Sequence, residues 1–360
     1  MPSTHDVAHL FLVGFDGHTV SPGVRALIDL GVAGVILFGR NVESPRQVAE
    51  LCGEIKRLAG RPILICIDQE GGRVRRLREG FTAVPSMRAV GATGDERLAH
   101  EIGAVLGREL RAVNIDVDLA PSVDVDTNPA NPVIGDRSFG ASPELVARMG
   151  AAVIRGIQDQ GVAACAKHFP GHGDTAQDSH AELPRLPHAI ERLRAVELPP
   201  FRAAVEAGVA MVMTSHVVFE PVDPLLPATL SAAVIGGVLR REMGFDGVVV
   251  SDDLEMEAIA ANFSVDEVVT RGAGAGVDLL AVCHDEELQH RAIEALGAAV
   301  RLGAVSEERV AHANRRVGRL MDRYARGARA FDATVLGCEE HRAVVARVGK
   351  AVDGTDPTRR

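Results

Sequence analysis

The sequence predicts a single-domain (β/α)8 TIM barrel of the α/β class, and three observations carry this prediction. Eight short runs rich in Val, Ile and Leu recur along the chain, segments with helical spacing separate them, and glycines stand where several of these helices should end. The runs are almost continuously apolar, which is typical of parallel strands buried on both faces. Eight such units in one chain of 360 residues favour a closed barrel, with an open doubly wound sheet as the main alternative.

The eight predicted strands are the apolar runs themselves, taken in chain order. They are Leu10–Phe15, Val32–Phe38, Ile63–Ile67, Ile115–Leu119, Val162–Ala166, Ala210–Thr214, Gly247–Val250 and Val277–Val282.

Helix signals fill the segments between these runs. Ser44 and Pro45 open one helix as an N-cap and a first-turn proline, and Ser142 with Pro143 open another in the same way. Further helices are expected over Glu197–Ala207, Ala232–Met243, Asp266–Gly274 and Glu286–Leu302, and a last one, packed outside the barrel, over Glu307–Tyr324. The glycines at expected helix ends are Gly31, Gly161, Gly208, Gly244 and Gly276.

Composition is typical of a soluble globular protein. Hydrophobic residues make up 46% and charged residues 24%, which excludes a disordered chain, a fibre and a small disulfide scaffold. A net charge of −10 and an aromatic content of 3% argue against a nucleic-acid partner. Five scattered cysteines without CxxC spacing indicate reduced thiols. With no export signal and no run near the ~20 apolar residues of a membrane span, we expect a cytoplasmic monomer without a membrane partner.

We expect one barrel domain over residues 1–330 and a polar, frayed C-terminal tail over residues 331–360.

Polar and ionisable residues follow the predicted strands at their carboxyl ends, where the active sites of such barrels form. These segments are Asp68–Arg73, Asp124 and Asp126 leading to Gly135–Gly140, Lys167–Thr175 with Asp178–His180, Thr214–His216, and Ser251–Asp253. We therefore expect a site at this rim of the barrel.

Asp252 follows the seventh strand directly, so its backbone should be fixed at a strand tip. Lys167 and Arg137 nearby would keep this carboxylate ionised and able to attack an electrophilic carbon. The alternative is that Asp252 is only an N-cap for a helix beginning near Leu254.

Asp178 and His180 are two residues apart, so both side chains can project to the same side of an extended loop. An ionised Asp178 bonded to one ring nitrogen would raise the pKa of His180 and leave the other nitrogen free to protonate a leaving group. The alternative is a loop whose polar groups only satisfy its own backbone.

A metal site is an alternative for the same loop, because imidazoles and carboxylates are transition-metal ligands. The spacing of His168, His172, Asp174, Asp178 and His180 is not a strong metal signature. The glycine-containing segments match neither a phosphate loop nor a dinucleotide fingerprint. We expect no metal and no cofactor.

These segments carry a resemblance that covers about residues 7–325. Asp68–Arg73, Gly135–Phe139, Lys167–Thr175, Asp178–His180 and Ser251–Leu254 resemble, in this order, the motifs of glycoside hydrolase family 3. Within that family, they are similar to the single-domain NagZ-type β-N-acetylglucosaminidases (β-N-acetylhexosaminidases).

The resemblance implies a barrel that removes terminal β-linked N-acetylglucosamine with retention of configuration through a covalent glycosyl–enzyme intermediate. By motif, Asp252 would be the nucleophile, His180 the acid/base and Asp178 its dyad partner. The residues that would grip the sugar are Asp68, Arg76, Arg137, Lys167 and His168. The implied substrate is an N-acetylglucosaminyl muropeptide of cell-wall recycling or a chitooligosaccharide.

A His–Asp pair in place of the usual acid carboxylate reduces the negative charge where the second nucleophile enters. Phosphate could then replace water, so an N-acetylglucosaminide phosphorylase stays an alternative. A β-glucosidase or β-xylosidase on the same scaffold and a non-catalytic sugar-binding protein are the others. Glu255 departs from the family pattern and places an extra carboxylate near Asp252, which could alter the aglycone preference if it points inward.

Overall fold

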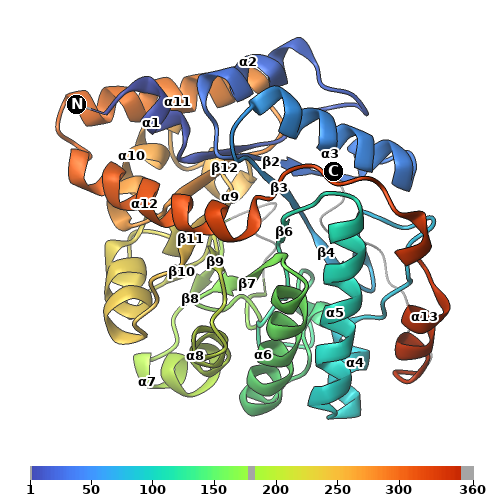
Figure 1. Ribbon diagram of the computed structural model, residues 1–360. Helices are drawn as coiled ribbons and strands as arrows, with labels where there is room; N and C mark the ends of the chain where they lie inside the picture. Colours follow the sequence, from blue (N-terminus) through green and yellow to red (C-terminus); the bar gives the residue numbers. More distant parts are fainter. Residues whose placement is uncertain (1, 177–182, 350–360) are drawn as a thin grey trace.

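The computed structural model describes residues 2–176 and 183–349 of the chain (Figure 1). Eight parallel strands close into a barrel in which each strand pairs with its neighbours in chain order. They are β1 (Phe11–Val13), β2 (Gly34–Leu37), β3 (Leu64–Ile67), β6 (Val117–Asp118), β7 (Ala163–Phe169), β9 (Met211–Thr214), β11 (Val248–Asp253) and β12 (Leu279–Val282). The predicted barrel is confirmed, and the open-sheet alternative is wrong because β1 pairs with both β2 and β12.

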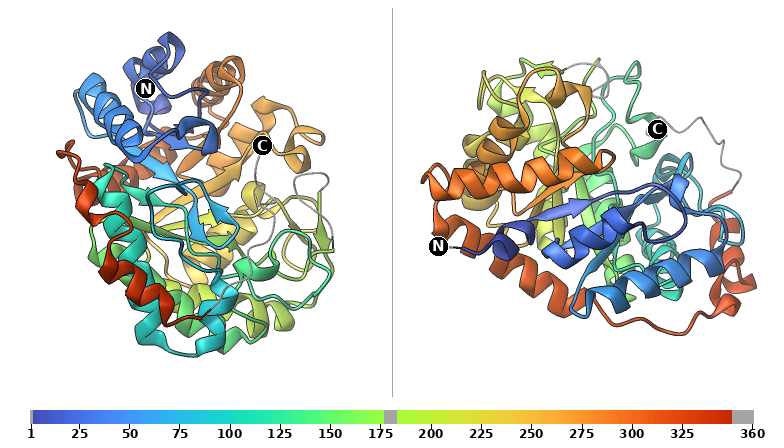
Figure 2. Two further views of the ribbon diagram at one scale, coloured as in Figure 1. Left: turned by 90° about the vertical axis from the view of Figure 1, so that its right-hand side faces the viewer. Right: turned by 90° about the horizontal axis from the view of Figure 1, so that it is seen from above.

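Helices surround this barrel on the outside (Figures 1 and 2). The α-helices are α1 (Thr4–Ala8), α2 (Pro22–Leu30), α3 (Pro45–Ala59), α4 (Met87–Thr93), α5 (Glu96–Ala112), α6 (Pro143–Asp159), α7 (Ile190–Arg192), α8 (Leu198–Glu206), α9 (Glu257–Ala260), α10 (Val265–Ala275), α11 (Glu286–Arg301), α12 (Glu307–Tyr324) and α13 (Glu339–Ala346). Short 3-10 and π segments are η1 (Gly39–Asn41), η2 (Gly135–Arg137), η3 (Leu193–Glu197), η4 (Ala228–Leu230), η5 (Ala233–Glu242) and η6 (Ala333–Val335).

The helix starts that were predicted from caps form as expected. The Ser44 hydroxyl accepts the backbone N–H of Gln47, and the Ser142 hydroxyl accepts that of Leu145, each with a proline in the first turn. A hydroxyl in this position satisfies one of the backbone donors that the first helical turn leaves unpaired. Helix α2 ends at Gly31, whose φ of 111° few residues other than glycine tolerate.

Alternating side chains of the strands build two apolar layers. On β3, Ile65 and Ile67 pack against the helices, whereas Leu64 and Cys66 pack inside the barrel. Helix α12 lies across one end of the barrel. Its buried side chains join the interior layer and close that end; they are Val317, Leu320, Met321 and Tyr324.

The carboxyl ends of the strands carry two small extra sheets. β4 (Gln69–Gly71) and β5 (Val74–Arg75) form an antiparallel hairpin directly after β3. β8 (Arg185–Leu186) and β10 (Val218–Phe219) form a parallel pair from the loops after β7 and β9. These additions surround the end of the barrel at which the sequence predicts the site.

The segment after Ala330 differs from the prediction of a frayed tail. Residues 331–349 contain η6 and α13, and α13 lies beside α5 (Figures 1 and 2). The cause is a buried carboxylate on α5, because Glu109 accepts hydrogen bonds from the Gly337 backbone at 2.8 Å and from Nδ1 of His341 at 2.9 Å. The domain boundary itself stays a prediction. In the described part of the chain, no helix combines the length and the apolar character needed to cross a membrane.

Candidate active site

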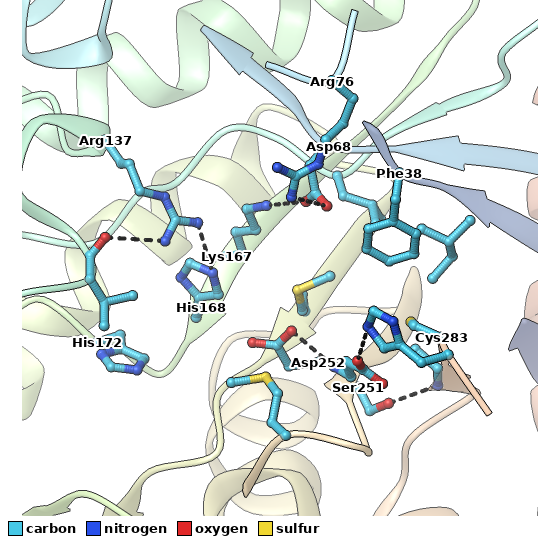
Figure 3. Close-up of a pocket in the computed structure, with 18 residues that line it drawn as sticks. Phe38, Asp68, Arg76, Arg137, Lys167, His168, His172, Ser251, Asp252 and Cys283 are labelled. Atoms are coloured by element: carbon cyan, nitrogen blue, oxygen red, sulfur yellow. Dashed lines mark hydrogen bonds and ion pairs between the residues drawn. The ribbon is translucent and has the colours of Figure 1, made fainter. Parts of the chain in front are cut away.

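A pocket opens at the carboxyl ends of the barrel strands (Figure 3). Ile36, Leu119, Met213 and Ala281 form its apolar floor, and polar side chains from the loops form its walls. Six of the eight predicted site residues line it, namely Asp68, Arg76, Arg137, Lys167, His168 and Asp252. The other two, Asp178 and His180, lie outside the described residues.

A network of buried ion pairs forms one side of the pocket. Lys167 lies near the end of β7 and places Nζ 2.7 Å from both Asp68 Oδ1 and Glu70 Oε1. Arg137 binds the Glu70 carboxylate through two hydrogen bonds, from Nε at 2.9 Å and from Nη2 at 2.7 Å. Arg76 completes the network with Nη2 3.4 Å from Asp68 Oδ2. Cations and carboxylates alternate, so each buried charge is compensated by a neighbour.

This alternation fixes the protonation states of the network. Burial by itself raises the pKa of Asp68, but the Lys167 and Arg76 charges outweigh burial and the net shift is downward. Burial opposes ionisation of Glu70 as well, and the charges of Arg137 and Lys167 hold its pKa well below the usual range. The same carboxylates raise the pKa of Lys167 against the effect of its burial. All these groups are therefore charged at neutral pH and act as strong hydrogen-bonding partners.

Asp124 orders the loop that follows β7. Its Oδ2 lies 2.7 Å from His168 Nδ1, and its carboxylate accepts the backbone N–H groups of His168 and, at 2.6 Å, of His172. Arg137 Nη2 approaches His168 Nε2 at 3.2 Å, so this nitrogen must accept while Nδ1 carries the hydrogen. Burial raises the pKa of Asp124, but the two histidines outweigh it and lower the pKa to about 2. Asp124 therefore fixes the ring of His168 in one orientation.

Asp252 lies within β11 and lines the pocket, between the buried ion pairs and the opposite wall (Figure 3). Its Oδ1 accepts the backbone N–H of Asp253 at 2.9 Å. The next helix, α9, begins at Glu257 after Met256, whose side chain makes no capping hydrogen bond. The interpretation of Asp252 as a helix N-cap is therefore wrong.

Neighbouring elements hold the end of β11 in place. The Ser251 hydroxyl accepts the Ala281 N–H of β12 at 2.9 Å. From the loop after β9, His216 Nε2 lies 2.9 Å from the carbonyl oxygen of Asp253, to which it donates. The carboxylate of Asp252 is thus presented from a backbone tied on both sides.

Glu255 does not add a carboxylate to the pocket. Its Oε2 accepts the backbone N–H groups of Cys283 and His284, each at 2.6 Å, and its Oε1 accepts that of Asp285 at 2.8 Å. The first two of these residues line the pocket. Glu255 therefore acts on the loop after β12 and not directly on the space beside Asp252.

A less polar wall begins beside Arg76, whose guanidinium lies 6.0 Å from the centre of the Phe38 ring (Figure 3). Phe38 at the end of β2 and His284 in the loop after β12 lie with ring centroids 5.4 Å apart. Cys283 lines the same wall, and burial together with Asp253 raises the pKa of its thiol well above the usual value. This thiol is neutral and does not compete with Asp252 as a nucleophile.

The histidines and carboxylates of the predicted loop separate into different networks. Asp174 accepts a hydrogen bond from Thr127 Oγ1 and pairs with His188 and Arg192, away from Asp124 and its two histidines. Among the residues that the structure describes, no group of three or more His, Cys, Asp or Glu side chains has an arrangement suited to a metal ion.

Several residues that line or support the pocket received no role from the sequence. Glu70 lies inside a motif that we recognised, and Asp124 follows the fourth predicted strand, yet neither was assigned a function. Phe38 and His284 come directly after the second and eighth predicted strands. The rule that residues at the carboxyl ends of barrel strands form the site would have identified both of them.

The fold and the site are those of a barrel enzyme, with a strand-end carboxylate and fixed charged groups in one pocket. Comparison with known proteins specifies the family. The model of the glycosyl hydrolase family 3 N-terminal domain matches residues 7–320, and the chain belongs to glycoside hydrolase family 3. The predicted family, fold and enzyme class are confirmed.

Curated and solved relatives agree with this assignment. The β-hexosaminidase of Thiobacillus denitrificans is 46% identical over 270 residues, which cover 73% of this chain and 75% of that protein. A solved family 3 β-N-acetylglucosaminidase from Paenibacillus sp. FPU-7 superposes with a TM-score of 0.93 at 48% identity, covering 97% of this chain and 68% of that one. NagZ from Neisseria gonorrhoeae, in complex with N-trifluoroacetyl-D-glucosamine, has a TM-score of 0.80 at 32% identity, and the match covers 94% of this chain and 96% of that one.

Proposed function

We propose that this glycoside hydrolase is a retaining exo-β-N-acetylglucosaminidase that works through a covalent glycosyl–Asp252 intermediate. The observation that carries the proposal is the position of Asp252, at a strand end in the same pocket as Asp68, Arg137, Lys167 and His168. The named activities of the relatives, β-hexosaminidase and β-N-acetylglucosaminidase, support the choice of sugar.

The ion-pair network suits a terminal sugar because its groups are fixed before the substrate arrives. Lys167 and Arg137 are almost fully buried and already bonded to carboxylates, so little side-chain entropy is lost when they bind hydroxyls. The Asp68 carboxylate can accept hydrogen bonds from the sugar, because 16% of its side chain is exposed. A terminal sugar that bonds to this network places its anomeric carbon over Asp252.

The reaction then has two steps. An oxygen of Asp252 attacks the anomeric carbon, and the leaving oxygen takes a proton from His180. Water next gives a proton to His180 and attacks the same carbon, which frees Asp252. Two inversions at one carbon give net retention of configuration.

His180 and Asp178 receive these roles from the family resemblance. Asp178 would orient the imidazole and stabilise its charged form. A His180→Ala variant is expected to lose far less activity on a glycoside with an activated phenol leaving group than on one with a sugar leaving group. Equal losses on both glycosides would remove His180 from the acid role.

The substrate proposed for this site is an N-acetylglucosaminyl muropeptide fragment, with chitooligosaccharides as the second candidate class. Turnover of the two substrates at matched concentrations separates these classes. The choice of sugar is tested by comparing a chromogenic N-acetylglucosaminide with the matching glucoside in the same assay. Faster turnover of the glucoside would overturn the proposal. Formation of N-acetylglucosamine 1-phosphate in added phosphate would identify the phosphorylase alternative.

The nucleophile is tested by trapping. A slow fluorinated N-acetylglucosamine analogue should add one sugar mass to the protein, and peptide mapping should place it on Asp252. Asp252→Ala should abolish both labelling and turnover while the thermal transition is kept. Asp266→Ala, at an exposed position of α10, is the matched control and should behave as wild type. A label on another residue would overturn the assignment.

A further inference from the structure

The pocket has two unlike sides, and the proposed chemistry gives no role to Phe38, Cys283 or His284 on one of them. Arg137, His168 and His172 lie on one side of Asp252, whereas Phe38 and Cys283 lie on the other (Figure 3). The polar side is deeply buried. On the other side His284 keeps 29% of its side chain exposed, which places this wall at the rim of the pocket.

The rim wall is built from two rings held by their neighbours. The rings of Phe38 and His284 contact one another at 5.4 Å, and the Arg40 guanidinium lies 4.4 Å from the centre of the Phe38 ring. Arg40 also donates to the carbonyl oxygen of Cys283 at 2.5 Å, which ties the loop after β2 to the loop after β12. His284 Nε2 lies 3.3 Å from Asp253 Oδ2, directly beside the proposed nucleophile in sequence. The wall is therefore anchored to the backbone that carries Asp252.

Glu255 fixes the backbone of the same loop. Its carboxylate takes three successive N–H groups, from Cys283 to Asp285, immediately before α11. A carboxylate surrounded by backbone donors at the start of a helix holds them strongly, because each bond is charge-assisted. The side chain of His284 has its place at the rim because Glu255 holds its main chain.

We propose that Phe38 and His284 form the binding wall for the sugar unit that follows the cleaved bond, and that Glu255 is the positioning residue for this wall. The inference rests on the proposed function. With the terminal sugar bonded to the buried charges, the next unit must pass the rim. Aromatic side chains offer rigid apolar faces for the C–H faces of such a ring, and the polar edge of the imidazole remains available to its hydroxyls.

Two glycosides separate this role from general support of the fold. Methyl β-N-acetylglucosaminide has no second ring, whereas N,N′-diacetylchitobiose has one. For His284→Ala, kcat/KM on chitobiose should fall about five- to tenfold more than on the methyl glycoside, the size of one lost aromatic contact. Glu255→Gln retains a single carbonyl acceptor for three donors and should shift the same ratio less. Glu287→Gln, at an exposed position of α11, should leave the ratio unchanged.

The double variant shows whether Glu255 acts through His284. If it does, the ratio of kcat/KM on chitobiose to kcat/KM on the methyl glycoside is the same in the His284→Ala, Glu255→Gln double variant as in His284→Ala alone. Additive losses would overturn the positioning role, and equal losses on both glycosides in the single variants would overturn the wall. Thermal transitions of all variants report folding separately. A wild-type enzyme that cleaves neither glycoside would contradict the proposed function itself.

Discussion

Arg137 and Glu70 form a buried pair joined by two parallel hydrogen bonds, although 67 positions separate them in the chain. Glu70 comes from the hairpin after β3, and Arg137 comes from η2. The same Glu70 carboxylate also binds Lys167 at the end of β7. One carboxylate thus sets the positions of two cations that face the proposed sugar.

Glu70→Gln should destabilise the protein because it removes a buried charge and leaves Arg137 and Lys167 undercompensated. The free energy of unfolding should fall by about 3 kcal/mol, measured by urea denaturation. Glu79→Gln, an exposed glutamate nearby, is the control and should change it by less than about 0.5 kcal/mol. Similar values for the two variants would show that the pair does not contribute to stability.

Asp124→Asn should weaken substrate binding, because the amide cannot accept every hydrogen bond that the carboxylate takes from His168 and His172. Hydrogen bonds to charged groups contribute about 1.5–3 kcal/mol, so kcat/KM for an N-acetylglucosaminide should fall roughly 10- to 150-fold. Steady-state kinetics measure this loss, with Asp322→Asn on the exposed face of α12 as the control. Unchanged kinetics would mean that His168 keeps its orientation without Asp124.

Stability should fall with acid in a window set by His172. Burial lowers the pKa of His172 from 6.5 to about 4. Between pH 6.5 and 4 the unfolded state binds a proton at His172 that the folded state does not bind. The contribution of His172 to the free energy of unfolding is therefore complete above pH 6.5 and is lost as the pH falls towards 4. The shift corresponds to about 3 kcal/mol. His172→Asn should show a shallower decline of unfolding free energy across this window, and an identical decline would contradict the assignment.

A chain that ends at Ala330 should be less stable than one that ends at Gly349. The shorter chain loses the Gly337 and His341 donors to Glu109 and leaves that buried carboxylate partly unsatisfied. The expected loss in unfolding free energy is about 1–3 kcal/mol. Thermal and urea unfolding of the two truncated chains against the full chain measure it. Equal stabilities would show that α13 adds nothing to the barrel.

The sequence predicted the strands well because each one is an apolar run with its own local signal. It failed where polar residues become buried through distant partners. β7 runs to Phe169, three residues beyond the prediction, because Lys167 and His168 find carboxylates from other loops. β6 keeps only Val117–Asp118 of its predicted run, and the side chain of Asp116 accepts the Ile65 N–H.

In the candidate site, too, local motifs could be predicted from the sequence and contacts between distant residues could not. The positions of Asp68, Lys167 and Asp252 at the rim come from local motifs at strand ends. The ring contact of Phe38 with His284 joins residues from opposite ends of the chain, and no spacing in the sequence encodes it. The direction of Glu255 was also inaccessible, because its partners are backbone groups of a loop some thirty residues later.

The closure of one barrel end by α12 has a kinetic consequence for the proposed reaction. Side chains of the interior layer and of α12 fill the barrel below the pocket, so the monosaccharide of the proposed reaction would leave through the opening that admitted the glycoside. A polymer cannot thread through such a dead end. In the proposed reaction the freed monosaccharide shares this opening with the incoming glycoside, so it competes with the next substrate for the pocket.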